Sequence, residues 1–100
     1  MRIDIQGIHV QPFEETRTRI EQKLRKVTEP YPFIHGGKVL LKKQKNESEA
    51  PFEVEVVLNL TRAELFASAK DADFFTAFDR VLDKLKRQIE KYKEKVYSNP

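Results

Sequence analysis

The densest group of charged side chains in the sequence lies near its C-terminal end, in the stretch DKLKRQIEKYKEK, residues 83–95. This stretch has six Lys or Arg residues against three Asp or Glu residues. The whole chain has 19 basic and 16 acidic residues, and its formal net charge of +3 equals the surplus of this one stretch. Clustered ammonium and guanidinium groups attract phosphates. The stretch is therefore either the solvated face of an ordinary helix or a surface for a negatively charged partner.

The spacing of apolar residues places this stretch in a long helix, predicted over residues 72–96. No Gly or Pro interrupts the segment, and Asp71 or Asp73 is expected to cap its N-terminus. Spacings of three and four residues are typical of a helix with one buried stripe. The residues of this stripe are Phe75, Phe78, Leu82, Leu85, Ile89, Tyr92 and Val96.

Charges of opposite sign are separated around this predicted helix. With Phe75 at zero and 100° per residue, one group lies between about 40° and 100° and the other between about 120° and 200°. The first group is the acidic row, formed by Asp79, Asp83, Glu90 and Glu94. The second is the basic row, formed by Arg80, Lys84, Arg87, Lys91 and Lys95. The basic row is about 22 Å long, enough to follow several consecutive phosphates, whereas Lys86 and Lys93 lie off it and are expected to be only solvated.

A second basic cluster belongs to a helix predicted over residues 14–27. Arg19, Lys23 and Lys26 lie together on one flank of its apolar stripe. The two basic clusters would merge into one surface if these flanks face the same way, which the sequence leaves open. A merged surface would bind phosphates with strong salt dependence and little readout of base sequence. Arg17 lies closer to the stripe, either as a side chain that reaches past its edge or in a functional role.

The remaining segments predict a sheet that positions both helices. Apolar and polar residues alternate over 2–6 and 52–60, and shorter strands are predicted over 38–43 and 65–70. The Pro- and Gly-rich segment 30–37, which ends in His-Gly-Gly, reads as a flexible loop, and residues 45–51 and 61–64 read as turns. The predicted class is α+β with the order β-α-β-β-β-α. Two amphipathic helices are expected to pack side by side on one face of a four-stranded sheet, leaving the other face solvated.

The residue inventory argues against several classes of function. With no cysteine, disulfides, cysteine-based zinc sites and thiol catalysis are excluded. His9 and His35 lie in different segments, and no catalytic or phosphate-loop motif is present. We therefore expect no enzymatic activity, cofactor, metal or small-molecule substrate. The sequence also contains neither a membrane-spanning apolar run nor a signal peptide, so a cytoplasmic protein is predicted.

The C-terminal third resembles the ribosome hibernation-promoting factor family, also known as ribosome-associated inhibitors or sigma-54 modulation proteins. The resemblance rests on Ala-Ser-Ala at 67–69, an acidic turn at 71–73, the pair Phe74-Phe75, Ala-Phe-Asp at 77–79, and DKLKRQIEK at 83–91. The opening MRIDIQGIHV and the helical IEQKLRKV are also similar to the family, so the likeness covers nearly the whole chain. Phe75 stands where the family usually has Tyr, and Lys86 where it commonly has Glu.

The resemblance implies a bacterial protein that binds the small ribosomal subunit and its ribosomal RNA in stationary phase or stress. Such a translation inhibitor occupies the messenger and transfer RNA channel. The family's RNA-contacting residues match Lys23, Lys26, Lys84, Arg87 and Lys91. The implied domain spans residues 1–97, is similar to double-stranded RNA-binding domains, and is expected to be monomeric when free. Residues 98–100 form a short tail without the dimerisation domain of longer members.

Two other functions stay open from the sequence. The chain could bind double-stranded RNA on its own, without ribosomes. Alternatively, it could regulate another protein through the exposed sheet face, where Glu53 and Glu55 would be contacts. A membrane-bound helix is disfavoured, because the apolar stripe is needed for the core and the acidic row would be repelled by anionic lipid.

Overall fold

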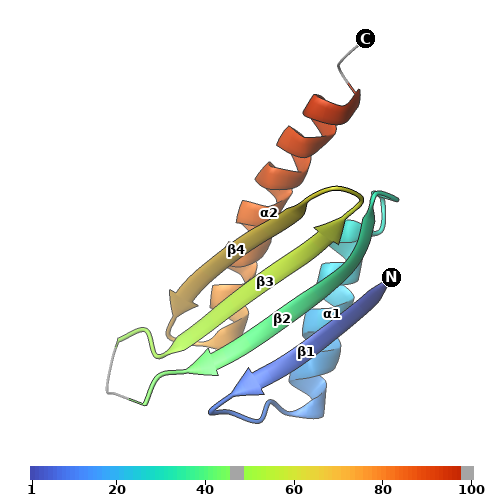
Figure 1. Cartoon of the computed structure of the whole chain (residues 1–100). Helices are drawn as coiled ribbons and strands as arrows, with labels where there is room; N and C mark the ends of the chain where they lie inside the picture. The colour runs from blue at the N-terminus through green and yellow to red at the C-terminus, as the bar shows by residue number, and fades with distance from the viewer. Residues whose placement is uncertain (46–48, 98–100) are drawn as a thin grey trace.

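The computed structural model describes residues 1–45 and 49–97 of the chain (Figure 1). The predicted tail at 98–100, and residues 46–48 of the predicted turn, lie outside the described residues. The α+β class and the order β-α-β-β-β-α are confirmed. The elements are β1 (Arg2–Ile8), α1 (Glu14–Thr28), β2 (Ile34–Lys43), β3 (Phe52–Leu60), β4 (Glu64–Asp71) and α2 (Phe74–Tyr97).

The four strands form one sheet in the order β1-β2-β3-β4. β1 runs parallel to β2, whereas β2, β3 and β4 pair antiparallel with their neighbours. The parallel pair needs a crossover connection, which α1 supplies. Both helices lie on the same face of the sheet, as predicted, and the C-terminal end of α2 extends past the strands (Figure 1). β1 and β4 are therefore the two edge strands.

The core lies between the helices and this face of the sheet. Alternate residues of β3, such as Val54, Val56 and Leu58, are completely buried, while the residues between them point to the solvated face. Phe78 is the largest of the fully buried side chains. The stripe predicted for α2 is buried from Phe78 to Ile89, and Phe75 and Tyr92 pack partly buried against the core. The prediction of a buried Val96 is wrong, because this residue lies where α2 extends past the sheet and is 47% exposed.

The His-Gly-Gly segment belongs to β2, so its prediction as a flexible loop is wrong. β2 begins at Ile34, and its register against β3 shifts between Ile34 and Gly36. A Cβ atom on Gly37 would lie 3.2 Å from a methyl carbon of Leu58 and 3.6 Å from one of Leu24. Glycine in a strand commonly marks a bulge or a close approach. Here it lets β2 pass tightly beneath α1.

Asp73 caps the N-terminus of α2, in agreement with one of the two predicted caps. Its carboxylate accepts hydrogen bonds from the Thr76 backbone N–H at 2.9 Å and from the Thr76 hydroxyl at 2.8 Å. Both bonds stabilise the ionised form, and they hold the pKa of Asp73 below its ordinary value of 3.8.

Replacement of Asp73 is expected to remove one acid-sensitive contribution to stability. Because the pKa is lower in the folded chain, the contribution is complete above about pH 3.8 and is lost as the pH falls towards the folded value. Asp73→Asn keeps a capping oxygen without the charge. The difference in unfolding free energy between wild type and variant, from urea titrations followed by circular dichroism, should be constant near neutrality and shrink in acid. A difference independent of pH would contradict this assignment.

Candidate nucleic-acid interface

Part of the basic row of α2 lies along the free edge of β4. The Arg80 guanidinium donates to the Lys70 carbonyl at 2.8 Å, and the Lys84 ammonium donates to the Ser68 carbonyl at 2.6 Å. The Gln88 amide continues the series by donating to the Phe66 carbonyl at 2.8 Å.

This series follows from the geometry of a helix packed antiparallel to a strand. Four residues of helix advance about 6 Å, and two residues of strand advance about 6.6 Å. Side chains four residues apart on α2 therefore meet every second carbonyl of β4, the ones that no neighbouring strand takes. Unpaired carbonyls on an edge strand invite pairing with another chain, and long side chains that cover them oppose it.

The other members of the basic row point into solvent. Arg87, Lys91 and Lys95 are exposed, and none of them has an ion pair or hydrogen bond to the residues that the structure describes. Arg80 is also partly open, with 54% of its side chain exposed. The basic row was predicted as one outward face. The structure divides it into cations that also hold the sheet edge and cations that are available to a ligand.

The basic cluster predicted on α1 faces α2, but it reaches the flank of α2 opposite to the basic row. The Arg19 guanidinium lies 4.4 Å from the centre of the Phe75 ring, in cation–π contact. Lys23 forms an ion pair with Asp79 at 3.0 Å. Lys26 lines a groove between the two helices.

The two basic clusters therefore do not merge directly. On the α2 wheel, Phe75 lies at 0° and Asp79 at about 40°, so α1 faces the side where the acidic row begins. The acidic row separates this side from the basic row at about 120° to 200°. An extended phosphate backbone that contacted both clusters would have to cross these carboxylates.

Lys86 is a residue whose position the sequence reasoning missed. It was expected to be only solvated, but it lines the same interhelical groove as Lys26 and Lys23. Its position on the helical wheel, about 20° and thus between Phe75 and Asp79, was the feature of the sequence that could have indicated this location. The wheel position alone does not show that this side of α2 faces another helix, because that depends on where α1 packs.

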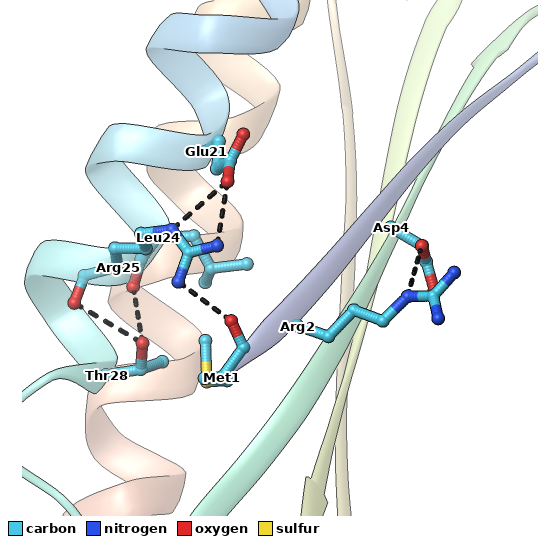
Figure 2. A network of polar contacts seen from close by, with 7 residues as sticks. All are labelled: Met1, Arg2, Asp4, Glu21, Leu24, Arg25 and Thr28. Carbon is cyan, nitrogen blue, oxygen red and sulfur yellow. Dashed lines mark hydrogen bonds and ion pairs between the residues drawn. The ribbon is translucent and has the colours of Figure 1, made fainter.

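Arg17 has a structural contact at the opposite edge of the sheet. Its guanidinium donates to the Ile5 carbonyl of β1 at 2.8 Å. Arg25, two turns later in α1, donates to the Met1 carbonyl at 2.8 Å and is held by Glu21 in an ion pair at 2.8 Å (Figure 2). The helices thus cover both sheet edges in the same manner, which accounts for an arginine so near the core.

The segment before β2 supplies an aromatic wall beside the groove. The Tyr31 hydroxyl donates to the Glu90 carboxylate at 3.1 Å, and its ring lies 5.5 Å from that of Phe33. The Glu90 hydrogen bond, assisted by partial burial and the negative charge of Glu90, raises the pKa of Tyr31 above 10.0. The phenol therefore stays neutral, and Phe33 in turn contacts Tyr92 on α2, with ring centres 5.0 Å apart.

The two histidines lie at opposite ends of the paired strands β1 and β2. His9, just after β1, is exposed with a φ of 59°. His35, near the start of the neighbouring strand β2, forms a hydrogen bond with Thr61 at 2.7 Å. Across residues 1–45 and 49–97, no three His, Cys, Asp or Glu side chains gather in a way that would hold a metal ion. Within the same ranges, neither helix has the length and hydrophobicity needed to cross a bilayer.

In a comparison with known protein families, residues 3–97 match the family described as Sigma 54 modulation protein / S30EA ribosomal protein. A relative from Pseudomonas putida, named ribosome hibernation promoting factor, is 33% identical over 98 residues, which cover 98% of this chain and 92% of the relative. A protein of the same name from Escherichia coli is 30% identical over 96 residues, covering 96% of this chain and 97% of that one.

Solved structures have the same fold. A ribosomal subunit interface protein from Coxiella burnetii superposes with a TM-score of 0.81 at 22% identity, covering 93% of this chain and 98% of the other. The N-terminal domain of Protein Y from Thermus thermophilus gives a TM-score of 0.77 at 23% identity, covering 92% of this chain and 99% of that domain.

Proposed function

The chain belongs to the Sigma 54 modulation protein / S30EA ribosomal protein family, and from this premise we propose that it is a ribosome hibernation factor. The Pseudomonas putida and Escherichia coli relatives, at 33% and 30% identity, carry that name and match over nearly their whole length. A factor of this kind acts in the cytoplasm, where the ribosomes are. It inhibits translation in stationary or stressed bacteria.

The finer proposal concerns the binding site and the mechanism. The protein binds the small ribosomal subunit as a monomer and occupies the channel for messenger and transfer RNA, so that inhibition is steric. The observation that carries this proposal is the set of exposed cations on α2 without partners in the described chain: Arg87, Lys91 and Lys95. Their attraction to ribosomal RNA phosphates is electrostatic, and Arg80 and Lys84 at the sheet edge add to the same field. Arg19, Lys23 and Lys26 would contact RNA from α1.

Sedimentation of ribosomes through sucrose gradients with the purified protein tests this function. We expect the protein to travel with small subunits and whole ribosomes, and to dissociate steeply as salt is raised. Protein that stays at the top of the gradient at physiological salt, or that follows only large subunits, would contradict the proposal. A gel shift with an RNA duplex of about 16 base pairs distinguishes a ribosome-binding factor from a stand-alone double-stranded RNA binder. Only the stand-alone binder would bind this duplex tightly without ribosomes.

A further inference from the structure

The groove between α1 and α2 has the size and lining of a small-molecule site. Its volume is about 610 Å³, within the range of about 300 to 1,000 Å³ for ligand pockets. Leu82 and Ile89 of α2 and Val27 of α1 supply apolar surface at its base. The groove is only partly enclosed, which suits a flat ligand with polar edges better than an alkyl chain that must be removed from water.

Two ammonium groups at this groove have no ion-pair partner among the described residues, and the groove keeps a net charge of +1 because its lining has three lysines but only two carboxylates, Asp79 and Glu90. Lys23 is neutralised by Asp79. Lys26 and Lys86, one from each helix, line the same groove and have no ion pair or hydrogen bond to the described residues. Like charges that share a site repel each other. An anionic group between them would remove this repulsion and form charge-assisted hydrogen bonds to both.

One wall of the groove is an aromatic ring whose orientation is already set. Tyr31 lines the groove and is held by its hydrogen bond to Glu90 and by its contact with the Phe33 ring. A side chain fixed before binding loses little conformational entropy when a ligand stacks on it. Aromatic rings provide stacking surfaces for every nucleobase, because each base has a π-face.

We propose that the interhelical groove binds a nucleotide, with the phosphate between Lys26 and Lys86 and the base against Tyr31 and the apolar floor. The ligand is a nucleoside monophosphate group, either free or as an unpaired nucleotide of an RNA chain. Asp79 and Glu90, which also line the groove, disfavour densely charged ligands such as duplex RNA or an acidic peptide. The site goes beyond the proposed ribosome binding, because a free nucleotide needs no ribosome.

Titration of the isotope-labelled full chain with adenosine monophosphate, followed by NMR, tests the site without ribosomes. We expect saturable shifts at backbone amides around Lys26, Tyr31 and Lys86. Binding should be weaker for inorganic phosphate or adenosine alone, because each lacks one half of the contact. No saturation at millimolar nucleotide would overturn the proposal. Equal affinity for inorganic phosphate would also overturn it, because the base would then contribute nothing.

Paired substitutions locate the phosphate. Lys26→Gln/Lys86→Gln should weaken nucleotide binding at least about tenfold, the usual consequence of losing hydrogen bonds to a charged group. The matched control Lys38→Gln/Lys45→Gln removes the same charge from exposed positions away from the helices, and should change affinity by no more than about twofold. Equal losses of nucleotide affinity in both variants would mean that only the net charge of the protein matters, and would overturn the assignment of the phosphate to Lys26 and Lys86.

A second titration distinguishes the two sources of the nucleotide. Tighter binding of a short single-stranded RNA, with shifts at the same amides, would assign the groove to RNA. Equal or tighter binding of the mononucleotide would assign it to a free nucleotide. Failure of the proposed function is visible separately, since ribosome sedimentation could be lost while the mononucleotide titration still saturates.

Discussion

Reversal of the exposed cations of α2 should abolish co-sedimentation with ribosomes. The full change is the triple variant Lys84→Glu/Arg87→Glu/Lys91→Glu, which replaces attraction to phosphate with repulsion along about two turns of the helix. Each charge-assisted hydrogen bond contributes about 1.5 to 3 kcal/mol, so loss of the pair at Arg87 and Lys91 alone corresponds to a hundredfold or more, roughly, in affinity. Gradient sedimentation at physiological salt measures the loss.

The structure indicates a sharper version of this experiment. Lys84 donates to the Ser68 carbonyl, so Lys84→Glu would also place a carboxylate beside the edge of β4 and disturb the fold. Arg87→Glu/Lys91→Glu avoids that contact. The two variants together separate a loss of RNA binding from a loss of sheet-edge protection.

A control with the same change in charge uses the exposed face of the sheet. Lys38 lies there on β2, and Lys45 is exposed beyond the end of that strand. Lys38→Glu/Lys45→Glu should keep ribosome binding near the wild-type level. If the α2 double variant still pelleted with ribosomes while the control did not, the exposed sheet face would be the contact surface, and the assignment to α2 would be wrong.

Truncation of Phe78 should have the largest effect on stability. Its side chain is completely buried between α2 and the sheet, and Phe→Ala substitutions in cores cost about 3 to 5 kcal/mol. Domains of this kind are stable by about 5 to 15 kcal/mol, so Phe78→Ala should bring the chain close to unfolding. Urea denaturation followed by circular dichroism should show a much lower midpoint with an unchanged slope.

Phe66 provides the matched control for this truncation. It lies on β4 opposite Val57, on the solvated face, with 52% of its surface exposed. Phe66→Ala should cost about 1 kcal/mol or less, the span of strand propensities. Similar losses for both variants would mean that the core does not lie where the alternation of β3 and the stripe of α2 place it.

Cations on both helices bind the edges of the sheet, so the number of positive charges on a helix does not tell how many of them are available to a ligand. Arg17 of α1 holds the Ile5 carbonyl of β1, and Arg25 holds the Met1 carbonyl just before that strand. Arg80 and Lys84 of α2 hold carbonyls of β4. These side chains serve the fold whether or not a ligand is present. The cations that remain uncommitted are the ones whose removal should affect binding more than stability.

The sequence by itself determined which face of β3 and of most of α2 is buried; Val96, the last residue of the predicted stripe, is the exception and is 47% exposed. Alternation in 52–60 and the three- and four-residue spacing after Phe75 report a property of each segment alone, so the strand, the stripe and the separation of acidic from basic rows are all readable without the fold. The Asp73 cap is readable for the same reason, since it depends on neighbours three residues away.

Only the tertiary structure decided what each exposed flank faces. The basic row of α2 borders β4, and its acidic row borders α1, because packing of the apolar stripe against the sheet fixes the rotation of the helix. The same rotation brings Lys86 to the groove shared with Lys26. The His-Gly-Gly segment is a strand for a comparable reason: its pairing partners on β1 and β3 are distant in sequence. The spacing of apolar residues shows which face of a helix or strand is buried. The elements that lie next to it depend on packing between segments that are distant in the sequence, and a local pattern does not show this packing.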